Sequence, residues 1–294
     1  MRRDLFTLPR AAGLALCVLL PAPAFSADPE TRLADTIARI ESGLDARVGV
    51  LVRDSATDWE WGHRSDERFL MASTFKSVLC GAVLARVDAG DLSLSEPLAV
   101  RKAAMIAHAP VTEKHVGGTM SIGELCFATL DMSDNPAANI LVERLGGTGA
   151  VTAFARALGD PVTRLDRLEP ELNLFEPGDL RDTTSPEAML FIWEAMLRGD
   201  ALSPASRAQL DAWMSEGGVT GKLLRASTPD DWAVADKSGA GRDHTRNLVA
   251  MVTPPGRDPY FVAIYLSDSP ADFAARNAAV AQIGKAVVDV IAAR

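Results

Sequence analysis

The chain has 294 residues, of which 48% are hydrophobic and 23% charged, and a formal net charge of −9. This composition is that of a globular protein and excludes a disordered chain. Because nucleic-acid phosphates are bound by basic surfaces, an acidic chain is a poor match for them. We therefore expect no nucleic-acid partner.

The first 26 residues are typical of a cleaved export signal. A basic start with Arg2 and Arg3 precedes a short apolar stretch at 11–20 and small residues up to Ser26. Cleavage there would remove three arginines and one aspartate, so that the net charge falls from −9 to −11. No segment reaches the roughly 20 apolar residues of a membrane helix. We expect a periplasmic or secreted protein, without membrane association after cleavage, that is exported by the Sec route or by the twin-arginine route.

The elements that follow begin with a helix and two strands. Apolar residues at helical spacing predict a helix over 29–44, and β-rich runs predict strands over 47–53 and about 59–63. From 74 to 89 the sequence is apolar on nearly every face, as in a helix buried on all sides. Gly90 is suited to end that helix.

The middle of the chain continues in helical patterns. Ser121 and Glu124 form a capping box that opens a helix through Leu130. Asp134 caps the next helix, which runs to Leu145. Further helices are predicted over 151–158, 185–197 and 203–213.

Strands return in the last quarter of the chain, over 232–238, 247–253 and 260–266, before a final helix over about 270–293. The short connections between these strands imply antiparallel pairing. We therefore expect an α/β (α+β) fold, with a five-stranded antiparallel sheet flanked by the N- and C-terminal helices and an inserted all-α lobe.

The two predicted lobes indicate where a ligand would bind. The α/β lobe would comprise 27–66 and 217–294, and the all-α lobe would comprise 67–216. A cleft between two lobes is where ligands commonly bind.

The most informative motif is Ser73-x-x-Lys76, which puts a hydroxyl and an amine on one face of a helix start. A nearby base can activate serine as a nucleophile, although alone the pattern could equally be a helix start with a solvated lysine. Three motifs follow it: Ser133-Asp134-Asn135, Glu169-Pro170-Glu171-Leu172-Asn173 and Lys237-Ser238-Gly239. Each alone could be a cap, a loop or a strand end, but their ordered occurrence in one exported chain makes a chance match negligible.

On these motifs the chain resembles the class A serine β-lactamases, from Leu44 through the C-terminal helix. The resemblance implies a monomeric hydrolase without a cofactor that opens the lactam ring of penicillins and simpler cephalosporins through a serine acyl-enzyme, giving antibiotic resistance. Alternatives of the same fold are a D-alanyl-D-alanine carboxypeptidase and a penicillin-sensing or penicillin-binding receptor domain that stays acylated. Glu169 with Asn173 argues against both, because the pair can activate a deacylating water.

The resemblance implies the following catalytic roles. Ser73 attacks the lactam carbonyl, and the backbone N–H groups of Ser73 and Ala240 form the oxyanion hole. Lys76, or Glu169 acting through a water held with Asn173, takes the serine proton, and the sequence leaves these two open. Glu169 then activates water against the acyl-enzyme.

The remaining site residues bind substrate or donate protons. Ser133, helped by Lys237, would protonate the lactam nitrogen, and Asn135 would bind the acylamino side chain. Charge-assisted bonds from Lys237, Ser238 and Arg246 would hold the substrate carboxylate. The implied substrate-binding residues are Asn135, Lys237, Ser238, Gly239, Ala240, Arg246 and His108.

The resemblance also implies structural roles. An Arg167–Asp182 salt bridge would close an Ω-loop at about 164–182, and the Glu169–Pro170 peptide would be cis. Asp134 would cap a helix beside the site.

Two cysteines, Cys80 and Cys126, remain in the mature chain. An even pair in an exported protein favours a disulfide over two buried thiols, and the resemblance implies the same pairing. The four histidines have neither His-x-x-x-His nor Cys-x-x-Cys spacing, so we expect no metal.

Departures from the family bear on substrate range. His108 stands where relatives often place an aromatic side chain at the site entrance. Ala72 and Gly241 occupy positions where the class A carbapenemases carry two cysteines, which argues against that activity. Arg242 adds a cation beside the last residues of the predicted strand.

Overall fold

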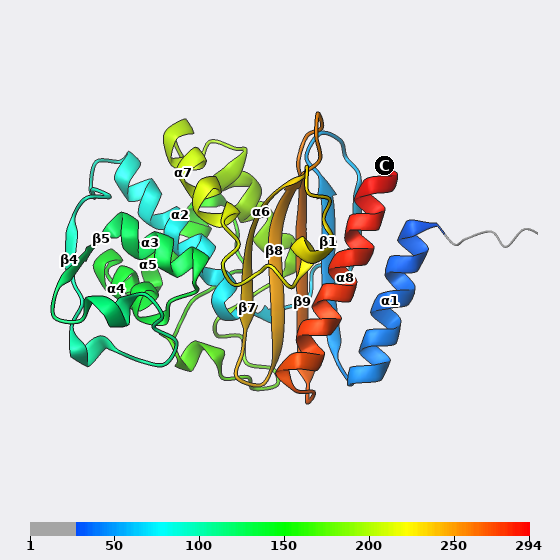
Figure 1. Cartoon of the computed structure of the whole chain (residues 1–294), viewed down its shortest axis with the longest axis horizontal. Coiled ribbons are helices and arrows are strands. Elements are labelled where there is room, and N and C mark those ends of the chain that lie inside the picture. Colours follow the sequence, from blue (N-terminus) through cyan, green and yellow to red (C-terminus); the bar gives the residue numbers. More distant parts are fainter. Residues whose placement is uncertain (1–27) are drawn as a thin grey trace, which may run out of the picture.

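The computed structural model describes residues 28–294 (Figure 1). The export signal predicted for residues 1–26 lies outside the described residues. Between residues 28 and 294, no helix is both long and apolar enough to cross a membrane.

A five-stranded antiparallel sheet runs through the centre of the protein (Figure 1) and confirms the predicted fold class. The strand order is β2-β1-β9-β8-β7, so β1 pairs on one side with β2 and on the other with β9, the last strand of the chain. The strands are β1 (Arg47–Asp54), β2 (Glu60–His63), β7 (Ala233–Ala240), β8 (His244–Thr253) and β9 (Tyr260–Ser269).

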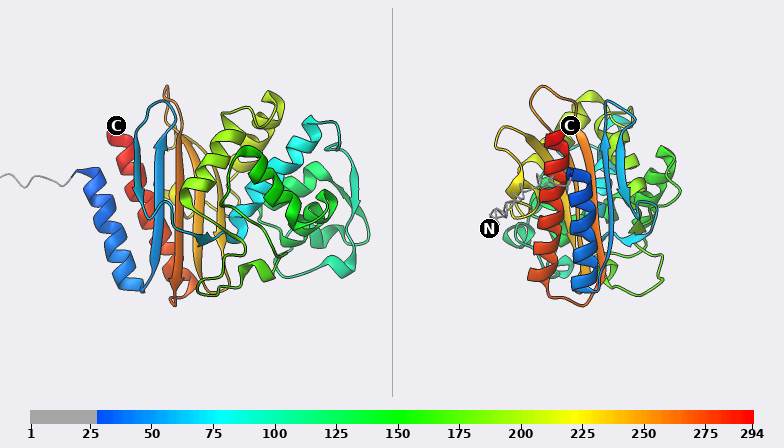
Figure 2. Two further views of the ribbon diagram at one scale, coloured as in Figure 1. Left: turned by 180° about the vertical axis from the view of Figure 1, so that it is seen from behind. Right: turned by 90° about the vertical axis from the view of Figure 1, so that its right-hand side faces the viewer.

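Two terminal helices, α1 (Pro29–Leu44) and α8 (Phe273–Ala293), lie side by side on one face of the sheet (Figure 2). Asp28 and Asp272 cap their N-termini, because each carboxylate accepts a backbone N–H of the first turn. Residues of β9 alternate between the two faces. Val262, Ile264 and Leu266 face these helices, and Phe261, Ala263 and Tyr265 belong to the core on the opposite face.

The opposite face of the sheet is covered by the helical part of the chain. Its central helix, α2, is buried without a break from Phe75 to Leu84, as the sequence predicted. Trp193 donates to the Ser77 hydroxyl at 3.0 Å and joins two of these helices. The helices are α2 (Phe75–Asp88), α3 (Ile122–Asp131), α4 (Asn135–Leu145), α5 (Thr148–Leu158), α6 (Pro186–Leu197) and α7 (Pro204–Ser215).

The prediction that the middle lobe is all-α is wrong in one respect, because the segment also holds two small two-stranded sheets. Strand β3 (Phe69–Leu70) pairs with β6 (Thr183–Thr184), and β4 (Pro97–Ala99) pairs with β5 (Thr119–Ser121). Strands of two or three residues are too short to show an alternating pattern, so periodicity could not reveal them.

Candidate active site

A cavity of about 410 Å³ opens between the helical part of the chain and strand β7. Its lining includes eight residues that the sequence analysis assigned to the site. It also includes Val219 and Phe273, which no sequence pattern predicted. Lys76, Glu169 and Lys237 lie buried behind this lining and reach it through hydrogen bonds. The predicted residues that line the cavity are Ser73, His108, Ser133, Asn135, Asn173, Ser238, Ala240 and Arg246.

The Ser73 side chain stands on a tight 3₁₀ turn (Ala72–Thr74) that leads directly into α2. Asn247 of β8 anchors this turn, since its amide donates to the carbonyls of Leu70 at 2.8 Å and Met71 at 3.0 Å. Gly239 of β7 packs against it so closely that a Cβ there would lie 2.7 Å from the Met71 oxygen. Only glycine fits at this position, and the nucleophile is thereby held against the edge of the sheet.

Lys76 lies one turn after the serine and is completely buried. Its ammonium donates to the Ser133 carbonyl at 2.8 Å and to Asn135 Oδ1 at 2.6 Å, and it lies 3.2 Å from Glu169 Oε1. Burial lowers the pKa of Lys76, while the Glu169 charge opposes that shift. Ser73 Oγ donates to Glu169 Oε1 at 3.4 Å, and within residues 28–294 no hydrogen bond joins it to Lys76. Lys76 and Ser73 are therefore linked through Glu169, which both contact. The hydrogens of the Lys76 ammonium are directed to other acceptors.

Ser133 lies between α3 and α4 with a left-handed backbone, φ 57°. Its hydroxyl oxygen accepts from two buried ammonium groups, Lys76 at 3.3 Å and Lys237 at 3.1 Å. Because a hydroxyl has two lone pairs and one hydrogen, this arrangement leaves the Ser133 O–H free to be donated. Burial, with the charges of Lys76 and Arg246, lowers the pKa of Lys237 well below its ordinary value.

Glu169 is 2% exposed and is fixed by two asparagines. The Asn139 amide clamps its backbone, accepting from the Glu169 N–H at 3.0 Å and donating to its carbonyl at 2.8 Å. Asn173 Nδ2 donates to Glu169 Oε2. The Glu169–Pro170 peptide is cis, as expected. Sequence analysis missed Asn139, although its place four residues after Asn135 puts it on the same face of α4.

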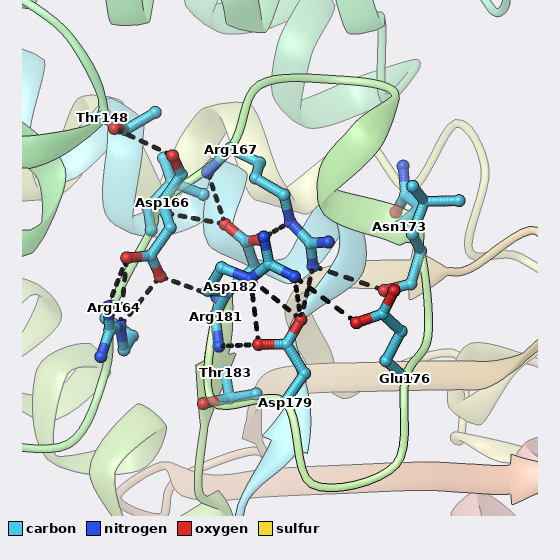
Figure 3. Close-up of polar contacts among 12 residues, drawn as sticks. Thr148, Arg164, Asp166, Arg167, Asn173, Glu176, Asp179, Arg181, Asp182 and Thr183 are labelled. Atoms are coloured by element: carbon cyan, nitrogen blue, oxygen red, sulfur yellow. Dashed lines mark hydrogen bonds and ion pairs between the residues drawn. The ribbon is translucent and has the colours of Figure 1, made fainter.

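The loop that carries Glu169 is closed by the ion pair predicted between Arg167 and Asp182 (Figure 3). Arg167 Nε lies 2.5 Å from Asp182 Oδ2, while Asp182 Oδ1 accepts the backbone N–H groups of Asp166 at 2.7 Å and Arg167 at 2.9 Å. Asp182 is completely buried. Farther along the loop, Asp179 pairs with Arg181 at 2.8 Å and with Arg167 at 3.7 Å. One buried carboxylate thus joins the two ends of the loop.

Asp134 caps α4, as expected, and also ties a neighbouring segment to it. Its carboxylate accepts from the Thr112 N–H and hydroxyl, both at 2.9 Å. In the same segment, the His108 carbonyl accepts from the Asn135 N–H at 3.0 Å. The His108 ring lies 2.9 Å from the Met132 carbonyl, at the rim of the cavity.

Arg246 of β8 is 5% exposed, yet no carboxylate pairs with it in the described part of the chain. Its guanidinium donates to the Gly239 carbonyl at 3.1 Å and to Asn277 Oδ1 at 3.0 and 3.1 Å. Burial and the neighbouring Arg276 lower its pKa to about 10. The cavity therefore holds a cation without a counterion, which suits an anionic ligand.

Cys80 of α2 and Cys126 of α3 are neighbours, but the expected disulfide is not present. Both are free thiols without exposed surface, and Cys80 Sγ lies 3.8 Å from the Cys126 carbonyl oxygen. Burial raises the pKa of the Cys80 thiol. The spacing correctly placed the two cysteines together, but proximity alone does not set their oxidation state.

Residues 28–294 contain no group of three or more His, Cys, Asp or Glu side chains arranged to hold a metal ion. The cavity brings together one serine hydroxyl, one buried carboxylate and the ammonium groups around Ser133.

Comparison with known proteins gives a consistent result along the chain. The model of the Beta-lactamase enzyme family matches residues 32–291. A β-lactamase of Rhodobacter capsulatus is 53% identical over 281 residues, covering 96% of each chain. A crystal structure of a β-lactamase from Xanthomonas campestris superposes with a TM-score of 0.87 at 46% identity, covering 90% of this chain and 100% of that one. An ancestral class A β-lactamase superposes with a TM-score of 0.85 at 50% identity, covering 87% and 99%.

Proposed function

This chain belongs to the class A serine β-lactamases, and we propose that it hydrolyses the ring of penicillins and simpler cephalosporins and so confers resistance to them. The reaction is the hydrolysis of a cyclic amide. The observation that carries the proposal is the buried Glu169 carboxylate 3.4 Å from Ser73 Oγ, because a carboxylate there can serve both serine and water as a base.

Acylation begins when Ser73 Oγ attacks the lactam carbonyl and its proton passes to Glu169 Oε1, the acceptor it already contacts. The backbone N–H groups of Ser73 and Ala240 stabilise the oxyanion, since the Gly239 backbone is packed against the serine turn. The geometry favours Glu169 over Lys76 as the base that takes the serine proton.

Ring opening requires a proton at the lactam nitrogen. Ser133 supplies it, because two ammonium donors leave its O–H free for this purpose. Lys76 restores the Ser133 proton, and Glu169 returns one to Lys76 across their 3.2 Å contact. Burial lowers the pKa of Lys76 and thereby makes this donation easier. The proton taken from Ser73 thus reaches the leaving nitrogen through a closed chain of contacts.

Deacylation uses the same carboxylate. Once the ester has formed, Glu169, whose Oε2 accepts from the Asn173 amide, deprotonates a water that attacks the acyl carbon. The bond between that carbon and Ser73 Oγ then breaks, and Glu169 returns the proton to the serine oxygen. The Asn139 clamp prevents the carboxylate from drifting, which matters because a displacement of about 1 Å can cost about a hundredfold in rate.

Substrate recognition follows from the charges of the cavity. Arg246, Lys237 and Ser238 hold the substrate carboxylate, and Asn135 holds the acylamino group. The His108 ring stands at the rim of the cavity, where the acyl substituent of a penicillin would lie.

The remaining proposals concern the protein in the cell. We propose that it is exported to the periplasm or secreted after cleavage near Ser26, and that it acts as a monomer. N-terminal sequencing of the protein from the culture and its molar mass by light scattering test the two statements separately.

The reaction is tested with Glu169→Asn. Acylation should be slowed but persist, and deacylation should lose several orders of magnitude. Intact-protein mass spectrometry with benzylpenicillin should then show a lasting adduct of one drug mass, which the further change Ser73→Ala abolishes. Rapid turnover without an adduct would show that Glu169 is not the base. A single burst of a chromogenic β-lactam by the unaltered protein would indicate a penicillin-binding receptor instead.

A further inference from the structure

A second cavity, of about 500 Å³, lies away from the catalytic serine, between the Ω-loop and the end of the sheet. On the loop side it is bounded by Leu174, Phe175 and Leu180, and on the opposite side by Arg68 and Leu70. Its volume lies within the usual range of small-molecule sites. None of the residues that line the catalytic cavity lines this one.

Arg68 is the unusual member of this cavity. Its Nη1 donates to the Val162 carbonyl at 2.9 Å and to Thr183 Oγ1 at 3.0 Å, which uses both hydrogens of that nitrogen. Its Nε and Nη2 have no hydrogen-bond partner, and no carboxylate pairs with it, anywhere in residues 28–294. A guanidinium binds carboxylates in bidentate fashion through two such adjacent nitrogens.

The other charges around the cavity restrict what could bind there. Arg47 is paired with Asp268 at 2.7 Å and stacks on a phenylalanine ring. It therefore does not present two adjacent free nitrogens to a ligand as Arg68 does. Asp179, which lines the cavity and is drawn in Figure 3, is paired with Arg181. The three acidic residues of the lining, Glu176, Asp179 and Asp268, are each paired with an arginine, so Arg68 is the one charged residue of the lining without an ion pair among residues 28–294. A ligand with a single negative charge matches it, whereas a phosphate or another polyanion would carry charge for which the lining has no partner.

The apolar wall indicates the rest of the ligand. Leu174 is 48% exposed and Leu180 is 52% exposed, although both stand on the cavity that Phe175 and Leu70 also line. Large aliphatic side chains left half-exposed beside a cavity favour an apolar occupant.

We propose that this cavity is a second ligand site, for an amphipathic monocarboxylate whose carboxylate binds the Nε and Nη2 edge of Arg68 and whose apolar body covers Leu174 and Leu180. The site requires no β-lactam turnover, so its test is independent of the proposed reaction.

The test is an ¹H–¹⁵N NMR titration of the mature protein with 4-phenylbutyrate, and with 4-phenylbutanamide as a neutral analogue of the same shape. We expect saturable shifts in residues 174–183 for the acid, and binding about tenfold weaker for the amide, because a hydrogen-bonded charge is lost. Arg68→Gln should weaken the binding of 4-phenylbutyrate by a similar factor. Arg246→Ala, which removes an arginine of the catalytic cavity, should leave these shifts unchanged.

A second pair of variants avoids altering Arg68. The exposed side chain of Leu180 can be replaced without disturbing the core. Leu180→Glu should weaken the binding of 4-phenylbutyrate several-fold more than Leu180→Gln does, because the added negative charge repels the carboxylate. The proposal is overturned if the acid gives no saturable shifts at millimolar concentration, or if acid and amide bind equally. It is also overturned if binding depends on Arg246 rather than on Arg68.

Discussion

Replacing Asp182 by asparagine tests whether one buried carboxylate closes the Ω-loop. In Asp182→Asn the remaining carbonyl oxygen can still accept the two backbone N–H groups that Oδ1 accepts now. The new amide NH₂, however, would face Arg167 Nε, which lies 2.5 Å from the present Oδ2, and two donors would oppose each other. Arg167, whose side chain is 14% exposed, would keep only Asp179 at 3.7 Å as a counterion.

The magnitude follows from the burial of the pair. Removing one partner of a buried ion pair costs about 3–5 kcal/mol, and the residual contact with Asp179 places this case near the lower end. A loss of about 3 kcal/mol corresponds to a fall in Tm of about 6–12 °C for a domain of this size. Because the same loop holds Glu169, we also expect kcat for benzylpenicillin to fall by about a hundredfold.

The assay is thermal unfolding followed by circular dichroism, combined with steady-state hydrolysis of benzylpenicillin. Arg181→Gln is the matched control, because Arg181 lies on the same loop, is 47% exposed and pairs with Asp179. An exposed pair contributes about 0–1 kcal/mol, so this variant should melt within a few degrees of the parent. If Asp182→Asn melts no lower than Arg181→Gln, the buried pair does not close the loop and the reasoning fails.

Three further predictions follow from the site. Arg246→Ala should raise KM for a penicillin more than it lowers kcat, because the guanidinium binds a carboxylate present in both ground and transition states; an unchanged KM would assign that role to another cation. Burial raises the pKa of Tyr265, so stability should be lost as pH rises above the unfolded value of about 10, and urea unfolding at pH 8 and 11 should show a loss smaller by about 1.4 kcal/mol in Tyr265→Phe; equal losses would contradict this. Because Cys80 and Cys126 are free and buried, a thiol reagent should titrate both only after unfolding; detecting none in denatured, unreduced protein would reveal a disulfide.

The sequence predicted the long elements well, because their patterns are local. The buried run from Phe75 to Leu84 and the capping box at Ser121 both appear where they were expected. The start of β8 at His244 lies three residues before the predicted strand. There the chain turns through a left-handed residue and an irregular register, which alternation cannot indicate.

Residues that stand in recognisable motifs were placed correctly at the cavity, whereas the residues that support them were not predicted. The side-chain amides of Asn139 and Asn247 donate hydrogen bonds to backbone carbonyls that lie 30 and more than 170 residues away along the chain. Such contacts depend on tertiary structure, and an asparagine in a helix or strand has no pattern that reveals them. Val219 and Phe273 likewise reach the cavity only because the fold brings distant segments together.

The whole chain is negatively charged, whereas the candidate active site holds buried cations. The chain carries a formal net charge of −9, which repels an anionic substrate at long range, but that repulsion decays within about 10 Å at ordinary ionic strength. At the site, three cations are buried, Lys76, Lys237 and Arg246, and Glu169 is the carboxylate that contacts Lys76. Buried cations are screened far less by salt than surface charges are. We therefore expect the desolvated cations at the cavity to select the substrate carboxylate, and the acidic surface to have little influence on which ligand binds.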